Sequence, residues 1–563
     1  MNHAIHADTV PHADPAAMAA KGFAKDAASN DFIHRLSISH GTLEPYANID
    51  DAILRANGHD QVLKRQFSWV SALGLSFSIT NSWIGYLSNF GQNLVYGGPQ
   101  SCIFGLLVAF AAQLVMTLGL GEIASAFPST GGQYHFCYIL SSPNTRRFAG
   151  YLIGWMSMLA WWIVTVLRCS GISLFSMTLA GMIQFWHPGF EGTQWQIYLI
   201  YVGTATVTVL PVISASQKIT FTVQLSLYSS VLGFLVLLFV AIALHKHSQP
   251  ASFLTQSGLG SSGWSAGIAW TLGIANAMYA FGGTDGVIHI SEEMPHPGRR
   301  VPQVMMLTMI IGLATAFPLF LSLMFYMEDF SAVISTRLPS LELINQVFVL
   351  LSRSTLATST LMQSQDRQRQ GHFVSIRLYP LRLSGGRLAW AFARDRGVPF
   401  SSYFANVDGK RHLPIRTTVA SYVFSCLYGL LYLASTSAFN SMVTSAVLFL
   451  NITYAAPQAI LLFRGRQRCL PRRYLNLGRA GYVCNTFSIL WTLVLLVFIC
   501  MPPSLPATPA SMNYTAVILV GLFFVIVFLW YMDGNKSFRG PEIDWDMIRS
   551  LNSGGVEAAN DTR

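Results

Sequence analysis

Long apolar runs dominate this chain, and short polar clusters separate them. A helix needs about 20 mostly apolar residues to cross the hydrocarbon core of a bilayer. Eleven runs have roughly this length, and a twelfth span is expected between Tyr326 and Ile415. The pattern therefore predicts an all-α membrane protein with about twelve transmembrane helices. The eleven runs are Ser68–Tyr86, Pro99–Leu120, Ala149–Gly171, Trp195–Ile213, Phe221–Leu244, Ala266–Ile288, Val304–Tyr326, Ile415–Leu433, Met442–Phe463, Val483–Met501 and Tyr514–Tyr531.

The loops that join these spans are alternately rich and poor in basic residues. Counted from a cytoplasmic N-terminus, the inner loops hold clusters such as Arg146 with Arg147 and Arg299 with Arg300. The outer loops 89–98, 435–441 and 502–513 hold no Lys or Arg. Because cytoplasmic loops concentrate Lys and Arg, we expect an even number of spans and both termini in the cytoplasm. The expected organisation is a polar N-terminal tail (1–66), a membrane domain (67–533) and a C-terminal tail (534–563).

Composition supports the membrane class and excludes others. The 563 residues are 52% hydrophobic and 11% charged, whereas a soluble domain carries roughly 25% charged residues. The basic residues of the inner loops explain the net charge of +10. Nucleic acid is not expected as a partner, because the sequence contains no basic face interleaved with aromatic residues. The cysteines form no Cys-x-x-Cys pair, so neither a metal site nor a disulfide framework is expected. No cofactor is expected, and no paired catalytic motif suggests an enzyme.

Two spans are interrupted by residues that weaken a helix. The first places polar side chains beside a glycine, and the sixth contains three glycines and an aspartate within an apolar run. Transporters bind substrate where helices break at mid-membrane, because the opened backbone can grip a ligand. Close helix packing by small residues is the alternative, although packing needs no acid. The predicted substrate-binding residues are Thr80, Asn81, Ser82 and Gly85 in the first span, and Tyr279, Phe281, Gly282, Gly283, Thr284 and Asp285 in the sixth.

Four titratable residues are candidates for ion coupling or gating. Asp285 could face a substrate ammonium, carry a coupling proton, or cap the second half of its helix. His289 could be a proton-sensitive group, because histidine side chains titrate near neutral pH; the alternative, which we favour, is a structural hydrogen-bonding residue. Arg168 lies inside the third span, where a charge is a functional candidate, although it could pair with an acid or extend to the interface. Glu122 lies at a predicted cytoplasmic end, with ion pairing to nearby loop arginines and simple solvation both open.

Three motifs resemble one transporter family. They are Gly121–Tyr134 (GEIASAFPSTGGQY), Phe281–Pro302 (beginning FGGTDGVIHISEEMP) and Gly386–Pro399 (GRLAWAFARDRGVP). In this order they resemble the amino acid–polyamine–organocation permeases, with the second motif most similar to the fungal GABA and choline permease branch. The resemblance implies a five-plus-five inverted repeat with broken helices 1 and 6, and proton-coupled import. One departure is that residues 220–244 of the fifth span hold no charge, whereas some members carry a coupling lysine there.

The expected eighth span departs further from the pattern. Residues 352–384 are polar and basic, with arginines that include Arg353, Arg367 and Arg369. Each would cost about 3 kcal/mol at the centre of a bilayer. Our hypothesis is a reading-frame or splicing error, in the gene or its model, that replaces an apolar span. If the segment is real, we expect a misfolded or inactive transporter. The alternative is an inserted loop with a degenerate crossing at Leu341–Leu351. An in-frame transcript that encodes the segment would rule out the error.

The sequence thus predicts a secondary transporter that imports an amino acid or a related amine such as GABA. A choline or quaternary amine permease is the alternative within transport. A non-transporting nutrient receptor is the alternative from another class, which the short tail after Asp533 disfavours. The expected partners are a small-molecule substrate, protons and the lipid bilayer. The expected location is the plasma membrane, with the vacuolar membrane as an alternative.

Overall fold

The computed structural model describes residues 49–167, 183, 192–214, 218–245, 247–336, 339–353, 383–409, 413–509 and 511–546. These residues form helices and connections, and no β-strand occurs among them. The chain divides into two units, residues 1–61 with 543–563 and residues 62–542. In the first unit, α2 (Ile49–Ala56) accepts a hydrogen bond from the Asp544 amide at the Ala56 carbonyl. The larger unit holds all the other helices.

Eight helices of the described residues are long and apolar enough to cross a membrane, which agrees with the predicted all-α membrane fold. Three further spans follow the expected order: α9 and two helices that are each broken in the middle. The eighth expected span falls mainly on residues 354–382, outside the described residues; before it lies α15 (Pro339–Arg353), and residues 383–394 after it are helical. The eight helices are α5 (Phe90–Ala126), α7 (Arg146–Leu167), α10 (Ile219–Leu244), α13 (Pro297–Phe325), α18 (Ile415–Ala434), α19 (Thr436–Arg464), α21 (Ala480–Phe498) and α22 (Thr515–Leu529, continued by η4 and α23).

The helices differ in how much of their apolar surface the unit covers. Of the most apolar stretch of each helix, 56% is buried in α5 and 67% in α7, but 22% in α10 and 17% in α22. An apolar surface left open over this length is what a lipid environment accommodates. α5 and α7 therefore form part of the interior of the bundle, whereas α10 and α22 leave broad apolar faces uncovered by the described residues.

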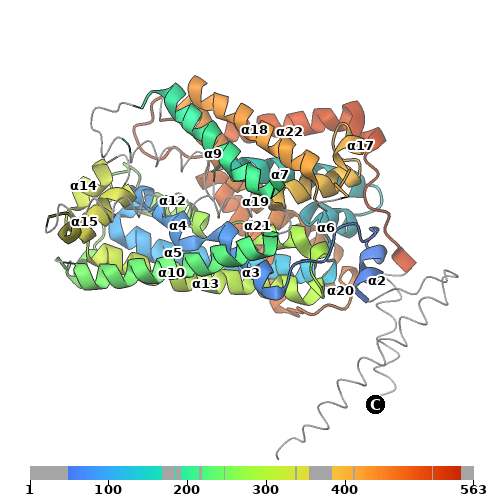
Figure 1. Ribbon diagram of the computed structural model, residues 1–563, viewed down its shortest axis with the longest axis horizontal. Helices are drawn as coiled ribbons and strands as arrows, with labels where there is room; N and C mark the ends of the chain where they lie inside the picture. Colours follow the sequence, from blue (N-terminus) through green and yellow to red (C-terminus); the bar gives the residue numbers. More distant parts are fainter. Residues whose placement is uncertain are drawn as a thin grey trace, which may run out of the picture. The chain divides into compact units, whose positions relative to one another are not determined.

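The interior helices lie between two outer groups (Figure 1). α3 (Trp69–Thr80), α10 and α13 pack together along one side, while α9 (Gln194–Ser214) pairs with α18 on the other. The α9–α18 pair is fixed by polar contacts: the Tyr201 hydroxyl donates to the Ser425 carbonyl at 2.6 Å, and the hydroxyls of Thr206 and Tyr422 are 2.8 Å apart.

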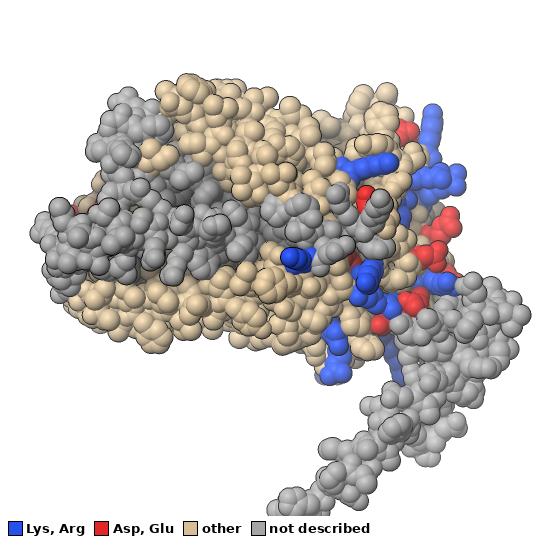
Figure 2. Space-filling view, viewed as in Figure 1, with Lys and Arg blue, Asp and Glu red and all other residues tan. Residues whose placement is uncertain are grey.

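Charged side chains gather at one end of this unit (Figure 2). That end holds short helices between the spans, α6 (Gln133–Leu140), α17 (Ser401–Phe404) and α20 (Arg466–Cys469), and we name it the charged end. The opposite end holds α14 (Phe330–Ser335) and α15. The remaining short helices are α11 (Ala251–Thr255), η4 (Trp530–Gly534) and α23 (Asn535–Ser537).

Candidate functional site

The first span is broken at Asn81. α3 ends at Thr80 and α4 (Ser82–Leu87) begins two residues later, while Asn81 itself adopts φ 34° and ψ 60°. This left-handed conformation is uncommon for residues other than glycine, and asparagine is one of the few that tolerate it. The break therefore lies at the centre of the predicted polar group, four residues before Gly85.

Serines of α10 hold the side chains at this break. The Ser230 hydroxyl donates to Asn81 Oδ1 at 3.0 Å and accepts from Trp83 Nε1 at 3.1 Å. Within the described residues, three other buried polar atoms at the break have no hydrogen-bond partner, namely Thr80 Oγ1, Asn81 Nδ2 and Ser82 Oγ. Buried polar atoms are nearly always satisfied, so unsatisfied ones at a helix break indicate a place for a ligand or water.

The sixth span is broken at the glycine cluster. α12 (Ala266–Ala277) tightens into the 3₁₀ turn η2 (Met278–Ala280), and the helical backbone then stops until η3 (Thr284–Glu293) begins. Gly283 has φ 80°, the left-handed region that favours glycine. Runs of 3₁₀ helix as long as η3 are uncommon and often mark a functional hinge.

The two breaks lie against each other. A Cβ placed on Gly85 would be 4.0 Å from the Ala280 Cα and from the Tyr279 ring. One placed on Gly286 would be 2.5 Å from the end of the Ile79 side chain, so η3 packs directly against α3. The structure thus brings together the residues that the sequence predicts from two distant spans.

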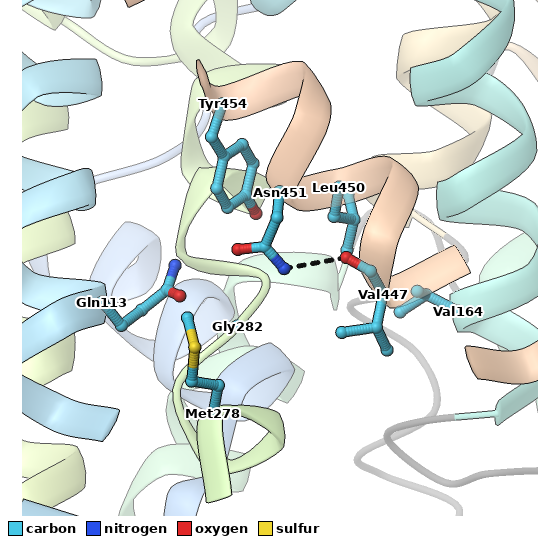
Figure 3. Close-up of a pocket in the computed structure, with 8 residues that line it drawn as sticks. All are labelled: Gln113, Val164, Met278, Gly282, Val447, Leu450, Asn451 and Tyr454. Atoms are coloured by element: carbon cyan, nitrogen blue, oxygen red, sulfur yellow. Dashed lines mark hydrogen bonds between the residues drawn. The ribbon is translucent and has the colours of Figure 1, made fainter. Parts of the chain in front are cut away.

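A small cavity adjoins the second break (Figure 3). Its volume is about 10 Å³, room for roughly one water molecule. Gly282 forms one wall, and the side chains of Gln113 on α5 and Asn451 on α19 point into the space between these helices. All eight lining residues are uncharged; they are Gln113, Val164, Met278, Gly282, Val447, Leu450, Asn451 and Tyr454. The elements around the cavity must move apart before a substrate can enter.

Two amide atoms at this cavity are unsatisfied in the described structure. Gln113 Nε2 is a buried donor and Asn451 Oδ1 a buried acceptor, and neither has a hydrogen-bond partner among the described residues. The other end of the Asn451 amide is fixed, because Nδ2 donates to the Val447 carbonyl at 2.8 Å. The cavity therefore offers one donor and one acceptor to a small polar molecule.

Asp285 lies just beyond this cavity and is fully buried. Gln133 Nε2 donates to its Oδ2 at 2.7 Å, and Trp161 Nε1 donates to the same oxygen at 3.1 Å. The Tyr454 hydroxyl donates to Oδ1. Asp285 thus connects η3 to α6, α7 and α19, and Tyr454 lies between this carboxylate and the cavity that it helps to line.

His289 belongs to the same network. Its Nε2 is 3.5 Å from Asp285 Oδ2, and its Nδ1 is 3.0 Å from the Thr130 carbonyl. The Trp161 ring meets the imidazole edge to face, with ring centroids 5.4 Å apart. The Thr130 carbonyl fixes Nδ1, whereas Nε2 faces the carboxylate at a distance longer than a normal hydrogen bond and has no hydrogen-bond partner among the described residues.

The carboxylates at the charged end pair with arginines far along the chain. Glu122 accepts from Arg466 and, at 2.8 Å, from Arg473 Nε. Glu292 pairs with Arg394 at 3.0 Å, and Arg387 Nη2 donates to Glu293 at 2.8 Å. The sequence left ion pairing and solvation of Glu122 open, and in the structure this carboxylate is ion-paired. Arg147 donates to the carbonyls of Asn535 and Phe538, and Arg299 stacks on the Tyr474 ring.

A tyrosine completes these contacts at the charged end. The Tyr134 hydroxyl on α6 donates to Asp395 Oδ2 at 2.9 Å. Burial, and then the neighbouring Asp395 carboxylate, raise the pKa of Tyr134 well above its ordinary value. The hydroxyl therefore stays protonated and keeps this bond.

Sequence reasoning missed several residues of the site and predicted others that remain untested. Gln113, Asn451 and Tyr454 are single polar residues in apolar segments, and no local signal marks them, whereas Gln133 lies within the first motif. Arg168, the predicted intramembrane charge, lies outside the described residues. Within the described residues, no group of three His, Cys, Asp or Glu side chains could hold a metal ion.

Comparison with models of known protein families assigns the chain to a family. The model described as "Amino acid permease" matches residues 67–361 and 375–524. The chain is a member of this family. The permease is therefore a multi-pass membrane transporter rather than an enzyme, and it acts on a small molecule. The gap in the match, 362–374, falls inside the polar segment 352–384.

Curated relatives span nearly the whole permease. A choline transporter of Saccharomyces cerevisiae is 29% identical, and the alignment covers 92% of this chain and 90% of that protein. The transmembrane transporter swnT of Metarhizium robertsii is 25% identical over 89% of this chain and 99% of its own length. The amino-acid permease BAT1 of Arabidopsis thaliana is 25% identical over 87% of this chain and 95% of its own length.

Proposed function

We propose that this permease imports a small organic amine, with choline-like amines as the first candidate and amino acids as the second. The observation that carries the proposal is the uncharged cavity at Gly282, with one free donor on Gln113 and one free acceptor on Asn451. A hydroxyl group can use both atoms, because it donates one hydrogen bond and accepts others.

Charge favours the choline-like class over amino acids. No cationic side chain is among the described residues that line the cavity, so a carboxylate would find no charged partner among them. A quaternary ammonium needs no hydrogen-bond donor, and aromatic side chains attract it through their π faces. The similarity to the yeast choline transporter supports the same ranking. The relatives named as amino-acid permeases keep amino acids as the second candidate.

We further propose that uptake is coupled to protons, that the permease acts in the plasma membrane, and that the charged end faces the cytoplasm with both termini. The gathering of basic side chains at that end supports this orientation through the positive-inside rule. Thr80, Asn81, Ser82, Gly85, Tyr279, Phe281, Gly282, Gly283 and Thr284 are the proposed surroundings of the substrate.

Uptake measurements in a yeast strain that lacks its own choline transport test this function. We expect saturable uptake of radiolabelled choline, with GABA or a basic amino acid as a weaker substrate. Gly282→Leu should abolish uptake at normal surface expression, because the side chain fills the cavity. Gly521→Leu is the matched control, since no atom lies within 4 Å of a Cβ at that lipid-facing position.

Failure of uptake would have a clear meaning. A wild-type protein that reaches the surface but carries no amine would favour the non-transporting receptor. An inactive product of a reading-frame error at residues 352–384 is distinguished by sequencing the transcript. A transcript that encodes an apolar segment there should restore uptake when it is expressed instead.

A further inference from the structure

Asp285 and His289 form an isolated titratable pair inside the permease. Both side chains have 0% relative exposure, and Nε2 faces Oδ2 at 3.5 Å. They lie four residues apart on η3, immediately after the glycine break. An unpaired charge is costly to bury in a protein. The protonation states of the two side chains must therefore depend on each other.

The Thr130 carbonyl determines where one proton of His289 sits. A carbonyl oxygen can only accept a hydrogen bond, so Nδ1, at 3.0 Å, carries a hydrogen. Nε2 then faces a carboxylate oxygen. If Nε2 and Asp285 were both unprotonated, a nitrogen lone pair would oppose an oxygen lone pair. One further proton, on Nε2 or on Asp285, removes this conflict.

The described neighbours of Asp285 supply no positive charge that could take the place of that proton. Gln133, Trp161 and Tyr454 donate hydrogen bonds, but all three are neutral. The side chains around the pair from the other packed elements are Ile79 of α3, Thr117 of α5, which contacts Thr284, and Ser384 of the helix 383–394. Among these described neighbours Tyr454 is the titratable group. Arg168 lies outside the described residues.

The other buried acids near η3 are neutralised differently. Glu292 pairs with Arg394, Glu293 with Arg387, and Glu122 with Arg466 and Arg473. Each of these acids has a permanent cation, because arginine does not lose its proton in proteins. Asp285 faces a histidine instead, and histidine gains and loses a proton near neutral pH. The contrast singles out one acid whose net charge can change.

We propose that Asp285 and His289 together bind the one proton that this permease carries with each substrate. This inference rests on the proposed function. The proton comes from water on the outer side, bonds to the pair, and leaves to water on the inner side; no other covalent bond changes. With the proton the pair is neutral, and without it the pair carries one negative charge.

The contacts of the pair link the proton to movement of the helices. Asp285 joins η3 to α6, α7 and α19, and Tyr454 also lines the cavity. A negatively charged Asp285 holds these donors more strongly, because hydrogen bonds to charged groups are stronger than neutral ones. The protonated pair holds them less strongly, so η3 can shift against its neighbours. Movement with substrate is therefore favoured when a proton is bound.

Purified permease in liposomes separates proton coupling from substrate binding. Counterflow of radiolabelled choline needs no proton gradient, whereas accumulation driven by an acidic exterior does. We expect His289→Gln to keep counterflow within about threefold of the wild type, and both His289→Gln and Asp285→Asn to lose at least tenfold in accumulation. The charge moved per substrate should fall by one, and the double variant should lose no more than either single variant.

His135→Gln is the matched control. His135 is a buried histidine on α6, and its replacement should leave accumulation and its pH dependence unchanged. Accumulation by His289→Gln at the wild-type level would overturn the inference, as would a parallel loss of counterflow in both variants. Wild-type accumulation that is independent of the pH gradient would also overturn it, whereas wild-type counterflow would still support the proposed function. A wild type with no counterflow of any amine would refute the proposed function itself.

Discussion

At the scale of single residues, Gln113 is the sharpest test of substrate recognition. Its Nε2 is buried and has no partner among the described residues, although it faces the cavity. A hydrogen bond from it to the substrate is worth about 0.5–1.5 kcal/mol. Gln113→Leu should therefore raise the KM for uptake about three- to tenfold, while the maximal rate at equal surface expression changes little.

The control for this prediction is Gln194→Leu, at the exposed start of α9. It makes the same chemical change far from the cavity, so KM should stay at the wild-type value. If Gln113→Leu also left KM unchanged, the amide would have no part in binding. A fall in the maximal rate alone would assign it to the movement of the helices.

Single residues also show what the sequence could reveal about the site. Asp285 was recognisable because an acid among three glycines in an apolar run has no packing role. Gln113 and Asn451 were not, since isolated amides also satisfy helix backbones in many membrane spans. Their importance depends on which atoms remain unsatisfied after α5 and α19 pack, and that is a tertiary property.

At the scale of helices, the contact between α3 and α10 depends on Gly74. A Cβ at this position would be 2.6 Å from the Val223 carbonyl oxygen, which belongs to the backbone and cannot rotate away. Gly74→Ala should therefore push the helices apart and destabilise the protein by about 1–3 kcal/mol. The measurement is the thermal midpoint of the detergent-solubilised permease.

Gly203→Ala on α9 is the matched comparison. No atom lies within 4 Å of a Cβ there, and alanine is about 1 kcal/mol better than glycine in a helix interior. Its midpoint should stay the same or rise. Equal midpoints for the two alanine variants would show that the α3–α10 contact is not tight in the membrane protein.

The breaks in the helices were predictable, but their details were not. Three glycines placed the second break correctly, because glycine opens a helix and accepts φ 80°. The first break was expected around Thr80 to Gly85, and the backbone turns at Asn81 instead of at the glycine. A kink within α5 at Gly97 and Gly98 was not predicted. The position of a break depends on contacts with neighbouring helices. At the first break, Ser230 of α10 forms hydrogen bonds with Asn81 and Trp83.

At the scale of the whole permease, the charged end is closed by ion pairs between distant parts of the chain. The sequence left the pairing of Glu122 open, whereas the structure joins Glu122, Glu292 and Glu293 to Arg466, Arg394 and Arg387. The sequence shows that charges collect on one side of the membrane, but not which pairs form. Pairing is decided by how the spans pack.

If the Glu122 ion pairs hold this end closed, Glu122→Gln should make the buried thiol of Cys484 more reactive. The substitution leaves Arg466, which is 3% exposed, without its carboxylate. Removing one partner of a buried ion pair costs about 3–5 kcal/mol, so the closed arrangement should open more often. Gly481 lies against the Arg466 guanidinium, and Cys484 is on the next turn of α21 and buried. A maleimide should therefore label Cys484 at least tenfold faster in the variant than in the wild type.

Cys102 provides the internal reference in the same molecules. It is buried and its Sγ contacts the Phe90 carbonyl. It precedes Glu122 by 20 residues on α5, which is about 30 Å along a helix. Labelling of Cys102 should stay slow, because opening the charged end does not unfold the bundle. Equal acceleration at both thiols would mean general destabilisation, and no acceleration at Cys484 would show that Glu122 does not hold this end closed. Selective labelling of Cys484 would identify the Glu122 ion pairs as a gate on the inner side of the substrate site.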